Sequence, residues 1–225
     1  VNDQLEERVK LRTRELETAN RDLARSNKEL DDFAYIASHD LKEPLRGIDN
    51  QVTFIIEDFG DTLDPRVRER IDKLPGILRH LEDLINTLLH FSRVGRQDLS
   101  MASTDLQATL TSILESLGSR IEELGVDIRL PRPLPEEHCD SARIGEVFRN
   151  LITNAMKYND KDEKWLEIGY EDVAGSRRYY VKDNGIGIRD RHLDKIFTIF
   201  KRLHGREKFG GGTGAGMTIV KKIVE

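Results

Sequence analysis

The sequence is short of the residues that cross-link a chain or anchor it in a membrane. It holds one cysteine, Cys139, which excludes an intrachain disulfide and is typical of a reducing, cytoplasmic compartment. No apolar run approaches the roughly 20 residues that cross a bilayer, and the charged beginning does not resemble a signal peptide. We therefore expect a cytoplasmic protein with no membrane segment in this stretch, and we expect any sensor domain to lie outside it.

An excess of positive charge is also missing. The chain has 36 basic and 41 acidic residues and a net charge of −5, which argues against a nucleic-acid-binding protein, whose surface should be basic. Charged residues make up 34% and hydrophobic residues 37%, a composition that predicts long amphipathic helices beside a modest core. With 225 residues, the chain can hold one large or two small domains.

The first forty residues carry a coiled-coil pattern. Steps of four and three residues connect Leu16, Asn20, Leu23, Asn27, Leu30, Ala34, Ala37 and Leu41. This spacing predicts a coiled coil, and asparagines on such a seam fix register and oligomer number, so we expect a parallel dimer. The alternative is a single solvated helix with a weak apolar stripe.

The pattern changes beside His39. Two consecutive four-residue steps lead from Ala37 through Leu41 to Leu45, a stutter that locally unwinds a supercoil. Pro44 cannot donate a hydrogen bond to the carbonyl of the residue four positions back. We therefore expect the helix to bend here, and helix geometry predicts that His39 points away from the seam into water.

A second helix should run back along the first. Residues 60–63 predict a turn, with Asp64 as N-cap and Pro65 as the first helical residue. Steps of three and four then connect Ile71, Leu74, Leu78, Leu81, Ile85 and Leu88. Two such helices from each of two subunits would form a four-helix bundle. Pro75 lies within this helix and predicts a kink near Ile71, whose carbonyl loses its donor.

The second half has the pattern of an α/β domain. After a linker that begins at residues 94–98, Asp105 is expected to cap a helix over 106–124, and Asp140 a helix over 143–158. Period-two alternation predicts strands over residues 126–130, 166–170 and 178–182.

One face of the helix after Asp140 is polar. Glu146, Asn150 and Asn154 are four residues apart and therefore share a face. Carboxylate and amide oxygens suit Mg²⁺, and Lys157, one turn further on, could reach a phosphate. The alternative for this pattern alone is a solvated polar face.

Two glycine-rich segments complete the pattern. Residues 183–187 (Asp-Asn-Gly-Ile-Gly) follow a strand, and their glycines allow a ligand to approach the backbone closely, while Asp183 could accept from an amine such as that of adenine. Residues 209–216 precede a helix over 217–225, where glycine amides would cradle phosphate and a lid could close. Taken alone, the first segment is equally typical of a plain turn. The alternative for the second segment is a flexible linker.

In this order, these motifs resemble those of the sensor histidine kinases of two-component signalling. Residues 38–45 resemble the phosphoacceptor box of the variety attached to phytochrome-like photosensors. The N box, first glycine box, F box and second glycine box match residues 149–155, 183–187, 197–200 and 212–216.

The resemblance implies an α+β multidomain protein. A coiled coil and a helical hairpin would form a dimeric four-helix bundle, followed by an α/β sandwich of the Bergerat ATP-binding type. It divides the chain into a coiled-coil linker (1–30), a dimerisation and phosphotransfer hairpin (31–98) and a catalytic ATP-binding domain (99–225) whose C-terminal end is expected to be truncated.

The resemblance also implies a function. A homodimer would use ATP and Mg²⁺ to phosphorylate His39 and pass the phosphoryl group to an aspartate of a response-regulator receiver domain, under an upstream sensor domain. Asp40 would orient the imidazole, and Asn154, with Asn150 and Glu146 beside it, would hold the metal. The residues implied for ATP binding are Asn150, Asn154, Lys157, Tyr158, Asp183, Gly185, Gly187, Ile188, Phe200, Arg202, Thr213, Gly214 and Gly216.

Three positions depart from the resemblance, and two other functions stay open. Glu43 stands where many relatives have Thr or Asn, so we expect little phosphatase activity; Ala215 and Met217 replace leucines, so we expect altered lid packing. A catalytically weak scaffold that binds a receiver domain is one alternative, against which the intact glycine boxes argue. The other is a GHKL-type ATPase related to chaperones and topoisomerases, which would need no acceptor such as His39.

Overall fold

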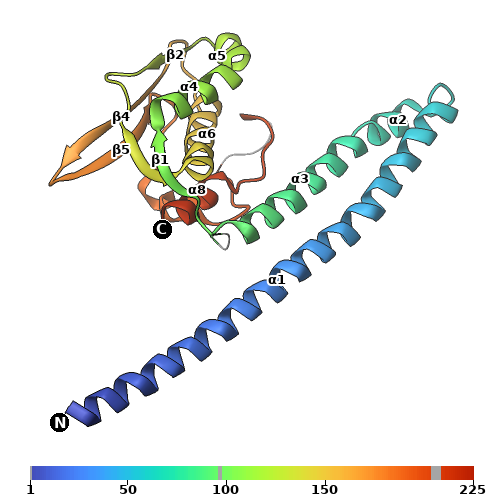
Figure 1. Ribbon diagram of the computed structural model, residues 1–225. Helices are drawn as coiled ribbons and strands as arrows, with labels where there is room; N and C mark the ends of the chain where they lie inside the picture. Colours follow the sequence, from blue (N-terminus) through green and yellow to red (C-terminus); the bar gives the residue numbers. More distant parts are fainter. Residues whose placement is uncertain (1, 96–97, 204–208) are drawn as a thin grey trace. The chain divides into compact units, whose positions relative to one another are not determined.

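The computed structural model describes residues 2–95, 98–203 and 209–225, without the side chains of residues 2–5, 23–24, 27–28 and 30–35. The chain divides into two compact units, Val1–Arg96 and Gln97–Glu225. The first is helical and the second combines helices and strands (Figure 1). The helical hairpin followed by an α/β domain is therefore confirmed. No helix in the described ranges is both long and apolar enough to cross a membrane.

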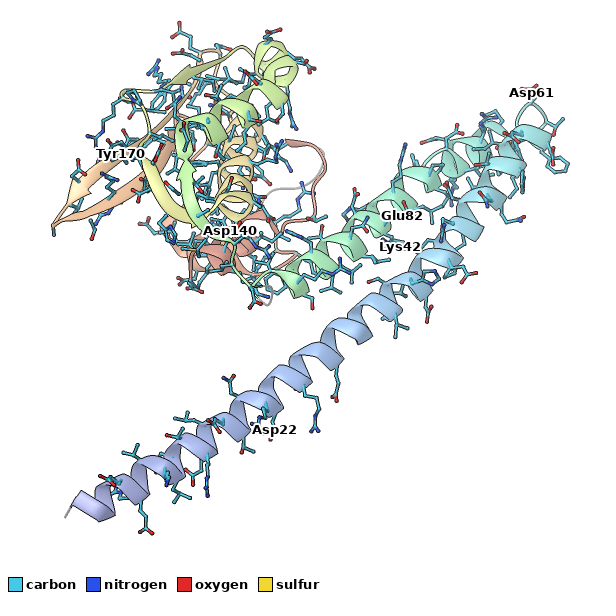
Figure 2. The ribbon with its side chains drawn as sticks, viewed as in Figure 1. Asp22, Lys42, Asp61, Glu82, Asp140 and Tyr170 are labelled. Atoms are coloured by element: carbon cyan, nitrogen blue, oxygen red, sulfur yellow. The ribbon has the colours of Figure 1, made fainter. Side chains whose placement is uncertain are left out.

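The first unit is a hairpin built on one long helix. Helix α1 (Asn2–Phe59) ends at a turn, and α2 (Pro65–Ile71) and α3 (Leu74–Arg93) return along it (Figure 1). Lys42 on α1 and Glu82 on α3 mark the level at which the two helices run side by side (Figure 2). The predicted cap is present: Asp64 Oδ1 accepts from the Arg66 amide at 2.8 Å, with Pro65 in the first turn.

The expected second helix is broken in two, and the prediction of one continuous helix was wrong. Helix α2 ends at Ile71, and α3 starts at Leu74 with Pro75 in its first turn. Since Pro75 cannot donate to the carbonyl of Ile71, the helical ladder stops there. The amides of Asp72 and Lys73 still donate to carbonyls of α2, those of Arg68 and Arg70, at 2.9 and 3.3 Å. The predicted kink is therefore a complete break.

Much of the apolar stripe of the hairpin is uncovered in a single chain. Val52 and Leu78 are buried, at 4% and 7% exposed. The exposed residues include Leu16 and Leu41 of the predicted seam and Leu74, Leu81 and Leu88 of the second predicted stripe. Ile48, Ile55 and Phe59, further along α1, are exposed as well. The side chains of Leu23, Asn27, Leu30 and Ala34 lie outside the described residues, so the central part of the predicted seam stays a prediction.

The second unit is a layer of helices against a three-stranded sheet. Strands β2 (Val126–Arg129), β4 (Lys164–Val173) and β5 (Ser176–Asp183) lie in the order β2-β4-β5, with β2 parallel and β5 antiparallel to β4. Helices α4 (Leu106–Ser116) and α6 (Ser141–Lys157) lie against one face of this sheet (Figure 1). Their shared core contains Leu106, Leu110, Ile113, Val126, Leu134, Phe148, Ile152, Ala155, Met156, Leu166 and Ile168.

Four further short helices lie in the described part of this unit. The expected helix over 106–124 is split at Leu117, and α5 (Gly118–Leu124) follows the break. Gly118 lacks a side chain to pack and weakens a helix interior, which explains why the prediction of one helix was wrong. Two 3₁₀ helices, η1 (Asp190–His192) and η2 (Asp194–Phe197), precede helix α8 (Gly216–Val224).

The unit also contains a second, two-stranded sheet that the sequence pattern did not predict. Strands β1 (Met101–Asp105) and β3 (Glu136–Asp140) pair antiparallel. Both are polar, without the apolar alternation that marks a strand, and Thr104 is the one residue of β1 that is buried. These strands are defined by their backbone pairing, and each leads directly into a helix, β1 into α4 and β3 into α6.

A hydrogen-bonded cluster joins the two sheets. Tyr179 Oη and Arg177 Nη1, both on β5, donate to Glu137 Oε1 on β3 at 2.5 and 2.8 Å. The bond from Tyr179 and then the bond from Arg177 hold the pKa of Glu137 below its ordinary value of 4.5. Burial and the same bond to Glu137 raise the pKa of Tyr179. Nearby, the ring of Tyr170 on β4 (labelled in Figure 2) is tilted by 37° to that of Tyr179, with the ring centroids 5.7 Å apart.

Replacing Glu137 should therefore make the second unit less stable in a pH-dependent way. We expect Glu137→Gln to lower the free energy of unfolding by about 1 kcal/mol at neutral pH, the typical net value of one such hydrogen bond. Because the folded pKa is lowered, this contribution is present above about pH 4.5 and is lost as the pH falls through the folded pKa. Urea unfolding followed by the fluorescence of Trp165, the single tryptophan, measures this unit.

Glu171→Gln is the matched control, because its cation Lys182 is 3.8 Å away and both side chains are more than half exposed. Equal stability of the parent and Glu137→Gln at neutral pH, or a deficit that persists unchanged in acid, would contradict this account of the cluster.

Candidate functional site

His39 lies on the exposed side of α1. Its side chain is 63% exposed, as its place between Ala37 and Leu41 predicts, whereas Ser38 beside it is buried. The Nδ1 atom faces Asp40 Oδ1 at 3.4 Å, longer than a normal hydrogen bond. Nε2, on the far side of the ring, is therefore directed away from Asp40. Pro44 stands inside α1, which continues to Phe59; the bend expected there stays a prediction.

The capping of α6 sets the direction of its polar face. Asp140 Oδ1 accepts from the Arg143 amide at 3.1 Å and starts the helix (Figure 2). Backbone bonds from Arg143 and then Ser100 hold the pKa of Asp140 below its ordinary value. With the helix started at this point, Phe148 and Ile152 face the core, and the predicted metal residues share another side.

The three residues predicted to hold a metal are half-buried on this helix. Asn150 Nδ2 donates to the Glu146 carbonyl at 3.0 Å, which leaves Asn150 Oδ1 for another partner. The Glu146 carboxylate lies 4.0 Å from Arg143 Nη1. In the described ranges no three His, Cys, Asp or Glu side chains gather to hold a metal, so a metal here would need amide oxygens. The oxygens of Asn150 and Asn154 are of the right chemistry for Mg²⁺.

The N-terminus of α8 lies against this polar face. A Cβ added at Gly216 would lie 2.7 Å from Asn150 Oδ1 and 3.8 Å from Asn154 Nδ2. The first turn of α8 has no side-chain cap, and Thr218 Oγ1 is buried without a hydrogen-bond partner among the described residues. Uncapped amides at a helix N-terminus attract anions. Ala215, one of the departures from the resemblance, is completely buried at this junction.

Two cations are directed at the glycine-rich segment before α8. Lys157 Nζ donates to the Gly211 carbonyl, and Arg202 donates to the carbonyls of Gly210 and Gly212 at 2.8 and 3.3 Å. Burial, and then the charges of Arg202 and Arg120, lower the pKa of Lys157. Arg202 Nε is buried and has no partner within the described part of the chain. Lys157 and Arg202 donate to carbonyls and repel one another, and an anionic ligand could accept from both and reduce that repulsion.

The first glycine-rich segment is joined to the end of α6. Gly185 N donates to Asp183 Oδ1 at 2.8 Å, and Ile186 N donates to the Tyr158 carbonyl at 3.0 Å. A Cβ at Gly185 would collide with that carbonyl, so only glycine fits. The structure thus brings Asp183, at the end of β5, beside the residue that follows α6.

The F box and the second glycine box also touch. Gly214 has a φ of 78°, and a Cβ there would lie 3.0 Å from Arg202 Cγ and 3.2 Å from the Phe200 carbonyl carbon. Phe200 itself has a φ of 61°, an uncommon conformation for a bulky residue. Thr213 is half-buried in the same segment. Gly187 and Ile188, by contrast, are exposed, and no described contact joins them to α6.

Three residues near the site were not singled out from the sequence. The ring of Phe209 lies edge-on to Tyr158, with centroids 5.6 Å apart, and its only sequence signal is its place before the glycines. Asn159 and Asn184 hydrogen-bond to each other at 2.9 Å. Asn184 lies within the first glycine box, but its contacts depend on tertiary structure and leave no pattern in the sequence.

Comparison with known proteins assigns both units. Residues 29–97 match the family model described as His Kinase A (phospho-acceptor) domain. Residues 139–225 match the model described as Histidine kinase-, DNA gyrase B-, and HSP90-like ATPase. These matches cover the hairpin with His39 and the helices and strands that carry both glycine-rich segments.

Two curated relatives, both phytochromes by name, match most of the length of this chain. The chain is 58% identical to cyanobacterial phytochrome B of Nostoc over 212 residues, which is 94% of this chain and 28% of that protein. It is 37% identical to phytochrome-like protein Cph1 of Synechocystis, with coverage of 94% and 28%. The chain thus spans less than a third of these phytochromes.

Solved structures show the same fold. Full-length ShkA in complex with AMPPNP superposes with a TM-score of 0.60 at 26% identity, over 84% of this chain and 40% of that one. The histidine kinase AdeS of Acinetobacter baumannii gives a TM-score of 0.55 at 24% identity, with coverage of 83% and 85%. With both family domains in order, the chain belongs to the sensor histidine kinases.

The contact at Gly216 generates a prediction for nucleotide binding. We expect Gly216→Ala to push Asn150 Oδ1 aside and to weaken the affinity for magnesium-ATP about tenfold or more, which corresponds to about 1.4 kcal/mol. Stability should change by less than about 1 kcal/mol, because alanine itself is a good helix former. Calorimetric titration gives the affinity, and Trp165 fluorescence in urea gives the stability.

Gly118→Ala is the control, since a Cβ there meets nothing within 4 Å. A Gly216→Ala protein that binds magnesium-ATP as tightly as the parent would show that the position of Asn150 does not matter for binding.

Proposed function

We propose that this chain is the catalytic portion of a histidine kinase that uses ATP to phosphorylate itself on His39 and then passes the phosphoryl group to an aspartate of a response regulator. The observation that carries the proposal is a pair of partial sites, one in each unit, that have the chemistry of a phosphoryl acceptor and of a phosphate-binding site. One is an exposed histidine whose Nδ1 faces a carboxylate. The other is a pair of cations and an uncapped helix end in the second unit. The family models and the AMPPNP complex of ShkA support it.

ATP is the proposed substrate of the second unit. Lys157 and Arg202 would exchange backbone carbonyls for phosphate oxygens, which would relieve the repulsion between the two cations. The amides at the start of α8 would add donors to the phosphates. Asp183 would read the adenine amine with the carboxylate oxygen that Gly185 does not occupy. Tyr158, with Phe209 edge-on to it, would contact the base.

Mg²⁺ is the proposed metal. Asn154 and Asn150 would hold it through their side-chain oxygens, with Glu146 one turn away, and Gly216 leaves the space that a Cβ would fill. When bound, the ion would neutralise charge on the phosphates. The role of the protein side chains would be to position the nucleotide and exclude alternative geometries.

His39 is the proposed nucleophile. With its proton on Nδ1 directed at Asp40, the lone pair on Nε2 attacks the γ-phosphorus, the bond from that phosphorus to the β,γ-bridging oxygen breaks, and ADP leaves. The product carries the phosphoryl group on Nε2 and keeps the proton on Nδ1. Asp40 balances the positive charge that the imidazole gains, so it acts through orientation and charge.

A homodimer is the proposed assembly. The exposed stripe of α1 and α3, which includes Leu41, Ile48 and Leu81, would be covered by the same stripe of a second chain in a four-helix bundle. Single chains rarely leave large apolar patches in water. The division into a linker (1–30), a hairpin (31–98) and an ATP-binding domain (99–225), a cytoplasmic location, a sensor domain elsewhere and weak phosphatase activity at Glu43 are parts of the same proposal.

Labelling with γ-³²P-ATP tests the transfer to His39. We expect the parent with Mg²⁺ to acquire an acid-labile, base-stable label, and His39→Gln to acquire none while it still binds ATP. His138→Gln is the control, because this exposed histidine of β3 has no proposed role.

ATP binding without any label on the parent would instead favour a scaffold. Release of free phosphate with no label would favour an ATPase of the chaperone and topoisomerase kind.

Asp40→Asn should slow labelling at saturating ATP about 100-fold or more, the range for loss of an acid–base or orienting group. The affinity for ATP should be unchanged, because Asp40 belongs to the helical unit. Rapid-quench measurement of the first turnover, beside an equilibrium titration with ATP, separates the two effects. A labelling rate equal to that of the parent would refute the orienting role.

A further inference from the structure

Asn184 makes three hydrogen bonds to two other segments of the second unit. Its Oδ1 accepts from Asn159 Nδ2 at 2.9 Å and from Trp165 N at 3.0 Å, and its Nδ2 donates to the Glu163 carbonyl at 2.8 Å. It therefore joins the end of β5 to the start of β4 and to the loop after α6. No other side chain between β5 and η1 has three such bonds among the described residues.

The orientation of both amides follows from their partners. Asn159 is 8% exposed, and its Oδ1 accepts from the Lys161 amide at 3.0 Å, so its Nδ2 must face Asn184. If the Asn184 amide were reversed, its NH₂ group would meet two donors and its oxygen would meet the Glu163 carbonyl. The orientation of the pair is therefore determined by its surroundings, and each of its four polar side-chain atoms has at least one partner.

Each residue of this pair directly follows a residue that the proposed function places at the adenine base. Asp183 precedes Asn184, and Tyr158 precedes Asn159. The Tyr158 carbonyl also accepts from Ile186 N at 3.0 Å. The first glycine-rich segment is thus held to the end of α6 on both sides of Gly185. These bonds fix where Asp183 lies relative to the helix that carries the phosphate and metal residues.

We propose that Asn184, through Asn159, is a positioning residue that sets the preference of the site for adenine. The inference rests on the proposed function, because it needs Asp183 to read the base. A carboxylate selects adenine only where it meets the exocyclic amine, and a displacement of about 1 Å in such a contact changes rates or affinities by about 100-fold. Phosphate contacts by Lys157 and Arg202 do not pass through this pair.

The test measures the binding of three ligands to the same variants. Calorimetric titration with Mg²⁺ present gives the Kd for ATP, for GTP and for inorganic tripolyphosphate. We expect Asn184→Ala to weaken ATP binding about tenfold or more, since it removes three hydrogen bonds. Tripolyphosphate should bind within about twofold of the parent, and the ratio of ATP to GTP affinity should fall. Autophosphorylation should show a raised KM for ATP with kcat near that of the parent.

Two further variants separate positioning from folding. Asn184→Asp keeps both acceptor bonds and loses only the donor to Glu163, so its ATP affinity should be intermediate. Asn159→Ala should reproduce the pattern of Asn184→Ala, and the double variant should be no worse than either single one, because both remove the same link. Asp162→Ala, an exposed residue of the same loop, is the control and should match the parent.

Two outcomes would overturn the positioning role of Asn184, and a third would overturn the proposed function on which it rests. Equal loss of ATP and tripolyphosphate binding, accompanied by a lower urea midpoint of Trp165 fluorescence, would mean a general structural role and would overturn the inference. Unchanged ATP affinity in both Asn184→Ala and Asn159→Ala would also overturn it. A parent that binds no ATP would overturn the proposed function, which is a separate outcome because it appears before any variant is made.

Discussion

The contact between α8 and the polar face of α6 is the constraint on which the nucleotide end of the second unit depends. Helix α6 buries Ile152 completely against the sheet, so its opposite side is free to carry amides. Gly216 allows the start of α8 to approach Asn150 more closely than any side chain would permit. That approach places the uncapped amides of α8 next to the predicted metal residues, and the glycine-rich segment must then lie within reach of Lys157.

The helical unit leaves much of its apolar surface exposed in a single chain. In one chain, Val52 and Leu78 find cover, while most of the stripe that the sequence pattern predicts is exposed. These exposed residues would be covered if they formed the proposed interface with a second copy. His39, between Ala37 and Leu41, is exposed to water and is not part of this stripe. The proposed dimer interface and the proposed phosphoryl acceptor therefore use different residues of α1.

The sequence predicted what depends on periodicity and capping. Strands with apolar alternation, such as β4, and helices with a capping aspartate, such as α6, were found to within a few residues. Polar β1 and β3 were not, because their pairing is the only thing that defines them. At Asp72 the proline predicted a kink but not a complete break, and the break at Leu117 was missed because the apolar pattern continues across Gly118. The motif positions of the site followed from the resemblance, whereas the link between Asn159 and Asn184 needed the fold.

The charge balance of the site explains why a ligand should matter to the second unit as a whole. The pKa of Lys157 is lowered in the folded chain, by burial first and by Arg202 and Arg120 after it. A group whose folded pKa is lowered binds its proton less tightly than in the unfolded chain, so a charged lysine at neutral pH opposes folding. Arg202, with a buried Nε that lacks a partner among the described residues, adds to the same cost. A polyphosphate would reverse both effects, since its charge favours the protonated lysine and its oxygens can accept from the guanidinium. The stability that the site gives up without a ligand would thus be recovered when a polyphosphate binds, which would couple binding to the stability of the second unit.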